Sequence, residues 1–478
     1  MIYTSVIRNL YPTYEYRSLY FLILYEELGF FVLIRMTIQV MEAQLQMEKW
    51  FKLKERGTTI PTEIIAGLTT FFTMVYIVIV NPGMLSSTGM DFNGVFIATV
   101  LASIIGTLIM GLGANYPIVI APGMGLNAFF AYSVVAGYGV SWQVALGAVF
   151  IAGMLFVILS LTSFRYMLLD AIPGSLKHAI TAGIGLFITT VGLQNAGIIV
   201  ASESNLIALG NLSDPMTMLT IIGLLITVVL MSYNVKGYLF IGMVVTAIIA
   251  WFMGLLQMPE SIVSMPTGLS STAFQLDIAG VFSSGLYTVI FTFLLITLFD
   301  TTGTMLGVAE KAGLIKEGKF PRSRGALLAD AVGTTSGALL GTSPTSAYIE
   351  SSTGVAAGGR TGLTAVVVSI LLALTLFFSP LIGVLSGISA ITAPALIIVG
   401  YFMINAISQV KWSDVEEAFP AFLIIILTPL THSIATGIGV GFIFYPLLKL
   451  LRGKGKDVHP IFYVFAILFF IQLVFLEH

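Results

Sequence analysis

Three carboxylic acids lie deep inside long apolar segments of this sequence, at Asp300, Asp330 and Glu350. An ionisable side chain at membrane depth is costly and marks a candidate functional site. Because burial favours the protonated form of an acid, such a group can take up a proton near neutral pH. The three acids therefore predict that transport of a solute is coupled to protons, with sodium as the alternative co-ion. For Asp330, a structural role with bonds to hydroxyl groups is an equally good interpretation.

Glu350 lies in a stretch, residues 341–354, that is unlike a lipid-facing helix because it is rich in hydroxyl groups. Broken backbone persists at membrane depth only where it is buried in protein or lines a cavity. We expect an extended segment from Pro344 to Tyr348 and a helix that starts near Glu350. The stretch therefore predicts a broken span that holds a carboxylate in the middle of a carrier.

Residues 116–127 show a similar pattern in the first half of the chain. Residues 118–120 are β-branched and favour extended backbone, and Pro122 suits the first turn of a helix. We therefore predict two short strands that pair at mid-membrane, each followed by a half-helix whose N-terminus faces the substrate. The alternative is two proline kinks in ordinary helices.

Further side chains are expected around the acids. Thr304 shares a helix face with Asp300, and Gly303 and Gly307 would permit close helix approach. In an extended segment Tyr348 faces the same side as Glu350. Its ring could then stack on a flat ligand, and the alternative is a buried tyrosine that serves in packing. The predicted substrate-binding residues are Gly123, Asn127, Asp300, Thr304, Tyr348, Glu350 and Ser351.

Acids, hydroxyls and an aromatic ring suit a small, planar, hydrogen-bonding solute, since a carboxylate can accept two ring N–H bonds. No basic residue is placed to neutralise an anion. The segment after Asp300 superficially resembles the Asp-Thr-Gly of aspartic proteases, but that chemistry needs two copies on β-rich lobes. We find no signature of an intramembrane enzyme, so we expect a transporter and not an enzyme.

Composition sets the class of protein. The chain has 478 residues, of which 57% are hydrophobic and 9% charged, and its mean hydropathy is +1.00. Soluble domains carry about 25% charged residues, so this is a polytopic membrane protein embedded in a lipid bilayer. The net charge of -2 predicts no nucleic-acid partner. The absence of cysteine and the spacing of four histidines predict no metal site and no cofactor.

Apolar segments of about 20 residues predict the spans. Fourteen are expected, near 63–82, 94–113, 116–136, 142–162, 178–195, 216–232, 237–257, 284–308, 323–341, 342–358, 361–380, 389–408, 417–431 and 433–451. This count places every basic cluster on the cytoplasmic side and requires a tight hairpin between the last two spans. Residues 458–476 either cross once more or lie at the surface. Residues 1–46 are expected to be an extension outside the transport fold, with an interfacial helix as the alternative.

The two halves of the chain look related, because the segment 102–111 resembles 333–341. Seven spans per repeat is an odd number, so the second repeat must be inverted relative to the first. Transporters with inverted repeats place the binding site at the interface of the two repeats. The fold class is therefore an all-α membrane protein of two inverted seven-span repeats with short strands in spans three and ten.

Four motifs, at 67–82, 121–130, 299–304 and 342–354, resemble the hypoxanthine/guanine permeases, the azaguanine-type branch of the xanthine/uracil permease (nucleobase–ascorbate transporter) superfamily. The resemblance covers roughly 47–476. It implies import of purine bases by proton symport across the plasma membrane, homodimers, and substrate acids at Asp300 and Glu350 with an aromatic at Tyr348. It also implies a core domain (47–162 and 284–380) that moves against a gate domain (163–283 and 381–456) in an elevator-type cycle, with 457–478 as a C-terminal apolar segment.

The sequence departs from the xanthine and uracil relatives at two positions. They often have histidine where this chain has Thr304, and glutamate where it has Asp300, which fits the purine branch better. Three alternatives remain open from sequence: a uracil or xanthine permease of the same fold, an anion carrier of the sulfate-transporter type, and a channel. An anion carrier would be expected to show a cationic site in place of Glu350.

Overall fold

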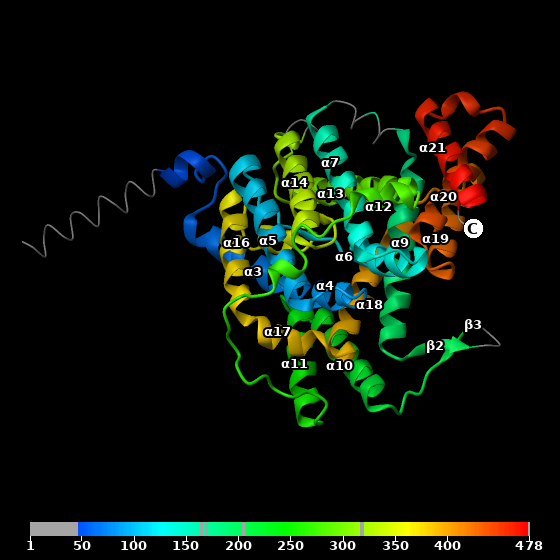
Figure 1. The fold of residues 1–478 in the computed structure, drawn as a ribbon. Coiled ribbons are helices and arrows are strands. Elements are labelled where there is room, and N and C mark those ends of the chain that lie inside the picture. The colour runs from blue at the N-terminus through cyan, green and yellow to red at the C-terminus, as the bar shows by residue number, and fades with distance from the viewer. Residues whose placement is uncertain (1–45, 163–166, 168–170, 203–205, 316–319, 477–478) are drawn as a thin grey trace, which may run out of the picture. The chain divides into compact units, whose positions relative to one another are not determined.

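The computed structural model describes residues 46–162, 167, 171–202, 206–315 and 320–476, which are mostly helical (Figure 1). Within these residues, nine helical segments are long and apolar enough to cross a membrane. They are built from α3 (Ile60–Met74) with α4 (Ile77–Ser86), α5 (Phe92–Leu108) with the π-helix η1 (Ile109–Ala114), α7 (Trp142–Leu161), α9 (Gly174–Asn195), α10 (Pro215–Ser232), α13 (Tyr287–Lys311), α16 (Gly362–Thr375) with η4 (Leu376–Phe378) and α17 (Ser379–Ser386), α18 (Ser389–Ile404) with η5 (Asn405–Gln409), and α20 (Ile434–Leu451).

Shorter elements complete the described chain, and helix is present in every apolar segment that was predicted as a span. The further helices include α14 (Ser323–Leu340), which has 18 residues, and the shorter α6 (Met124–Ala128) with the π-helix η2 (Phe129–Gly137), α11 (Tyr238–Phe252), η3 (Leu269–Ser271), α12 (Ile278–Ser283), α15 (Ser351–Ala356), α19 (Val415–Leu430), η6 (Gly455–Asp457), α21 (Pro460–Ile471) and η7 (Gln472–Leu476). A hairpin of β2 (Ile199–Ser202) and β3 (Leu206–Leu209) follows α9. The number of membrane crossings and the inverted repeats stay predictions.

The chain divides into two compact units. The first ends at Gly57, and the second begins at Thr58. In the first unit, residues 46–51 are helical and Lys52 forms an ion pair with Glu55 at 2.9 Å. The predicted extension 1–46 lies outside the described residues except for Gln46.

Two three-residue strands, one from each half of the second unit, pair with each other. Strand β1 (Ile120–Pro122) pairs antiparallel with β4 (Thr345–Ala347), and the central partners are Ala121 and Ser346. Both strands are fully buried. The predicted strand pair, each strand followed by a helix, is confirmed. One detail was wrong: Pro122 is the last residue of β1, and α6 starts at Met124, because the fixed φ of proline also suits extended backbone.

A break in the first long helix brings a tyrosine to the end of these strands. Helix α3 ends at Met74 and α4 begins at Ile77, so Val75 and Tyr76 lie between them. Pro82 inside α4 has no N–H to donate, so the carbonyl group of Val78 lacks its helical partner there. Tyr76 is 1% exposed and faces the region where α15 begins.

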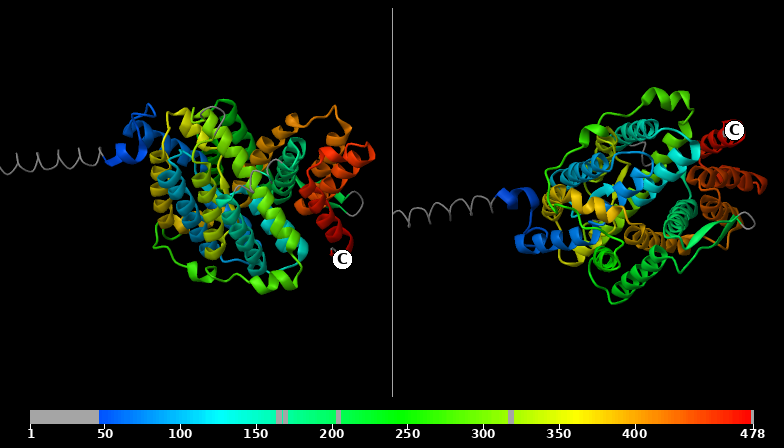
Figure 2. Two further views of the ribbon diagram at one scale, coloured as in Figure 1. Left: turned by 90° about the horizontal axis from the view of Figure 1, so that it is seen from above. Right: turned by 60° about the horizontal axis from the view of Figure 1, so that its bottom comes forward.

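The remaining helices pack in two groups around the strands. Helix α14 packs against α5 and α7, and α16 packs against α3, whereas α9 packs against α18 and α19. In both Figure 1 and the left view of Figure 2, the orange to red helices of residues 415–476 lie on the side away from the yellow α16. The predicted hairpin between 417–431 and 433–451 is confirmed, since α19 and α20 are separate helices that pack together.

Two predicted glycine contacts were wrong, and a different pair of glycines, Gly111 and Gly362, makes the closest approach among the described glycines. A Cβ added at Gly303 or Gly307 would meet no atom within 4 Å, so these glycines do not bring helices together. A Cβ at Gly362, in contrast, would lie 1.8 Å from the carbonyl oxygen of Gly111. The start of α16 therefore packs backbone to backbone against η1.

Replacing Gly362 by alanine is expected to lower stability by about 1–3 kcal/mol or more, because the added methyl group overlaps a backbone carbonyl that cannot rotate away. The measurement is the thermal unfolding midpoint of detergent-purified protein. Gly174→Ala is the matched control, since a Cβ there meets nothing within 4 Å. Equal midpoints for the two variants would contradict the prediction.

Candidate substrate site

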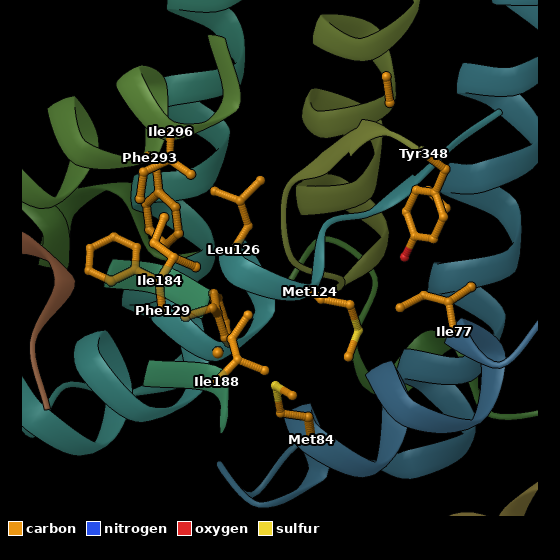
Figure 3. Close-up of a cluster of buried hydrophobic side chains, with 14 of the residues drawn as sticks. Ile77, Met84, Met124, Leu126, Phe129, Ile184, Ile188, Phe293, Ile296 and Tyr348 are labelled. Atoms are coloured by element: carbon orange, nitrogen blue, oxygen red, sulfur yellow. The ribbon is translucent and has the colours of Figure 1, made fainter. Parts of the chain in front are cut away.

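A cavity of about 110 Å³ lies where the broken helix, both strands and three long helices meet. Its polar lining comes from the α3–α4 break, α9, α13, β4 and the start of α15, and consists of Tyr76, Thr181, Asp300, Thr304, Ser346, Tyr348 and Glu350. Its apolar wall comes from β1–α6, α9, α13 and α18, and includes Leu126, Ile180, Ile184, Ile296, Phe299, Val399 and Met403. In Figure 3, Leu126, Ile184 and Ile296 lie together on the wall of this region.

Glu350 is held by a tyrosine from the other half of the chain. It immediately precedes α15 and has helical φ and ψ angles. The Tyr76 hydroxyl donates a hydrogen bond to its Oε1 atom at 2.7 Å. An ionised carboxylate has about four acceptor positions, so Glu350 keeps acceptor capacity for the N–H groups of a ligand.

Asp300 and Thr304 both line the cavity from α13, one helical turn apart. Asp300 shares the cavity lining with Ser346, the middle residue of β4. The cavity therefore has a carboxylate on each of two elements, α13 and the β4–α15 segment. Together they can accept hydrogen bonds from two edges of a small solute.

Tyr348 lines the cavity but uses its hydroxyl group elsewhere. The hydroxyl donates to the carbonyl oxygen of Pro122 at 2.6 Å, which fastens β4 to the end of β1. Figure 3 shows the ring between the strands and Ile77, on the Met124 side of the cavity. Tyr348 and Glu350 both line the cavity, as expected, but the reason was wrong. The backbone is not extended between them, because the chain turns after Tyr348, with the Ser351 N–H bonded to the Tyr348 carbonyl oxygen at 3.1 Å.

Two of the predicted contact residues, Ser351 and Asn127, are buried behind the cavity. The Ser351 hydroxyl oxygen accepts a hydrogen bond from the N–H of Val119 at 3.0 Å. Asn127 Oδ1 accepts one from Ser343 at 2.6 Å. Both side chains join β1–α6 to the β4–α15 segment. The structure thus brings Gly123, Asp300, Thr304, Tyr348 and Glu350 to the cavity and leaves Ser351 and Asn127 outside its lining.

Asp330 is fully buried in α14 and is also outside the lining. Its Oδ1 atom accepts a hydrogen bond from the Thr345 hydroxyl at 2.7 Å, and its Oδ2 atom accepts one from Thr301. Thr345 belongs to β4, and Thr301 follows Asp300 in α13. Asp330 therefore connects the two elements that carry the site acids, and the structural interpretation accounts for both of its oxygens.

Sequence reasoning missed Tyr76 and Ser346 as lining residues. Tyr76 lies in an apolar run that predicts an ordinary helix, and the one available signal was Pro82, which implies a break about one turn before it. Ser346 is one of several hydroxyl residues in the segment 341–354. Only the alternation of side chains along an extended strand could have distinguished it from its neighbours.

Replacing Tyr76 by phenylalanine is expected to raise the substrate concentration at half-maximal uptake by about fivefold to tenfold, because a hydrogen bond to a charged group contributes roughly 1–1.5 kcal/mol here. The ring, and so the packing at the helix break, is retained. The measurement is initial uptake at several substrate concentrations. Phe71→Leu, which alters packing in α3 without touching Glu350, serves as the control, and an unchanged half-maximal concentration in Tyr76→Phe would contradict the prediction.

A cavity that is lined by acids and lies among candidate membrane spans is typical of a multi-pass membrane permease. The chain belongs to the xanthine/uracil permease family, because the family model, described as "Permease family", matches residues 61–440. The guanine/hypoxanthine permease PbuO of Bacillus subtilis is 58% identical over 89% of this chain and 100% of its own length. The adenine permease AdeP of Escherichia coli is 46% identical over 91% of this chain and 97% of its own.

The fold is also found in solved transporter structures. The transmembrane domain of the cyanobacterial bicarbonate transporter BicA superposes with a TM-score of 0.59 at 16% identity, covering 78% of this chain and 96% of that one. At this identity the likeness concerns the fold alone.

Proposed function

We propose that this protein is a secondary active transporter that imports purine nucleobases. The observation that carries the proposal is the placement of Asp300, Glu350 and their hydroxyl neighbours around one small cavity. Purines present ring N–H groups that carboxylates can accept. The names of the relatives, guanine/hypoxanthine permease and adenine permease, support the same class of substrate.

An anionic substrate fits the cavity less well, although the fold is shared with a bicarbonate transporter. Within the described residues, the lining contains two carboxylates and neither lysine nor arginine. A bound anion would meet like charge without compensation, which is strongly unfavourable at low dielectric constant. The lining therefore supports a neutral solute that donates hydrogen bonds.

Proton symport and an elevator-type movement complete the proposal. The acids come from the proposed core domain (47–162 and 284–380), whereas Thr181, Ile184 and Met403 on the facing wall come from the proposed gate domain (163–283 and 381–456). Sliding of one domain past the other would expose the site to each side of the membrane in turn. Asp300 and Glu350 are the proposed proton carriers, and a homodimer in the plasma membrane is the proposed assembly.

The direct test is uptake of radiolabelled hypoxanthine by cells that lack their own purine permeases. Saturable uptake that unlabelled guanine or adenine inhibits, and uracil does not, would support the proposal. A proton ionophore should abolish accumulation, whereas removal of sodium should have no effect. Well-expressed protein that takes up no purine would refute the substrate assignment, and accumulation that follows the sodium gradient would refute proton coupling.

A further inference from the structure

A second cavity, remote from the substrate site, lies on the surface of the helix bundle between α3 and α11. It has a volume of about 420 Å³, and its walls are Ile65, Leu68 and Phe72 of α3 with Phe240 and Ile241 of α11. Three of these side chains, Ile65, Phe72 and Leu68, are 37–56% exposed. Gly237 closes one end of the groove, because a Cβ there would meet the carbonyl oxygen of Phe72 at 3.0 Å. Because α3 belongs to a candidate membrane span, we expect this open apolar groove to face lipid.

A single charged residue, Lys236, lines the same end of the groove. It is exposed, and none of the ion pairs among the described residues involves it. Helix α11, which begins two residues later, has 15 residues and so spans about 22 Å, less than the roughly 30 Å of bilayer hydrocarbon. One end of this helix is therefore expected near the headgroup level, where the exposed ammonium group of Lys236 can pair with an anionic headgroup.

We propose that the groove between α3 and α11 is a binding site for one anionic phospholipid. Its acyl chain fills the apolar groove, and its phosphate group pairs with Lys236. The charge on Lys236 is complementary to an anionic headgroup, and the described residues that line the groove include no carboxylate that would compete for it. Helix α3 belongs to the proposed core domain and α11 to the proposed gate domain, so the bound lipid contacts both moving parts.

The test measures lipid retention on the purified full-length protein by native mass spectrometry, with phosphatidylglycerol and phosphatidylcholine of identical acyl chains. The wild type is expected to retain phosphatidylglycerol about fivefold better, since one lysine near an anionic lipid contributes on the order of 1 kcal/mol. Lys236→Gln should remove this preference. Lys456→Gln, which removes another exposed lysine, should preserve it.

A groove-filling variant tests where the acyl chain lies. Ile241→Trp is expected to reduce retention of both lipids while leaving the headgroup preference of the remaining binding unchanged. The proposal is overturned if the wild type shows no preference, if Lys236→Gln keeps the wild-type preference, or if Ile241→Trp retains both lipids undiminished. In each of those cases, the lipid at the groove is an annular lipid without a specific binding site.

A further experiment, which measures transport, rests on the proposed transport activity. Wild-type protein in vesicles that contain phosphatidylglycerol should take up purine faster than in pure phosphatidylcholine, and Lys236→Gln should be insensitive to the difference. If no vesicle shows purine uptake, the transport proposal fails while the retention experiment still decides the lipid site. If uptake occurs equally in both lipids, the lipid has no role in movement and this arm of the inference is overturned.

Discussion

Glu350→Gln is expected to reduce purine uptake at low substrate concentration by about 100-fold, because the loss of two hydrogen bonds to a charged acceptor removes roughly 3 kcal/mol of binding. The amide keeps the size of the side chain and can still accept the Tyr76 hydroxyl hydrogen bond at one position. It cannot carry a negative charge or exchange a proton. Both substrate binding and coupling therefore fail in the same variant.

The measurement is initial uptake of radiolabelled hypoxanthine, normalised to the amount of protein in the membrane. Glu310→Gln is the matched control, because Glu310 is an exposed acid near the end of α13 and lies outside the cavity lining. The control should transport like the wild type. Normal uptake by Glu350→Gln would remove this residue from the site while leaving the substrate class to the wild-type experiment.

Glu63→Ala is expected to have the second-largest effect, on folding and not on the chemistry of the site. Glu63 is fully buried in the first turn of α3. Its carboxylate accepts hydrogen bonds from the backbone N–H groups of Arg360, Thr361 and Thr364 at 2.8, 3.3 and 3.2 Å, and from the Thr364 hydroxyl group at 2.5 Å. It thereby caps the N-terminus of α16 from a different helix.

Removing this carboxylate leaves several buried donors without an acceptor, at a cost of about 3–5 kcal/mol. We expect most of the protein to be lost from the membrane fraction and the remainder to unfold at a lower temperature. Glu63→Gln, which keeps acceptor atoms in place, should lie between the alanine variant and the wild type. Wild-type yield and thermal stability in Glu63→Ala would show that the cap is dispensable.

The sequence predicts the strands of the site because local rules act on neighbouring residues. β-Branched residues at 118–120 and the prolines at 122 and 344 favour extended backbone. Asp300 and Thr304 likewise reach one cavity because they are one helical turn apart. The cost of an acid at membrane depth identified Asp300 and Glu350 without any knowledge of the fold.

The interactions that sequence reasoning missed join residues far apart in the chain. Tyr76 and Glu350 are 274 positions apart, and Glu63 and Arg360 are 297 positions apart. An acid in the first turn of a helix is typical of helix starts in general, so Glu63 gave no sign that it caps a second helix. The contact that holds the segment after Tyr348 was missed for a related reason, since the Ser351 hydroxyl group accepts a hydrogen bond from the distant Val119 N–H in addition to the local bond to Tyr348.

The pairing of β1 with β4 has a consequence for the order in which the protein is made. The ribosome completes residues 120–122 long before it reaches residues 345–347, so the hydrogen bonds between β1 and β4 can form only after the second strand is made. Unpaired peptide groups are costly in hydrocarbon, which makes the incomplete chain dependent on the insertion machinery or on bound water. A truncated product that ends before β4 lacks Ser346, Tyr348 and Glu350 and therefore cannot form the cavity.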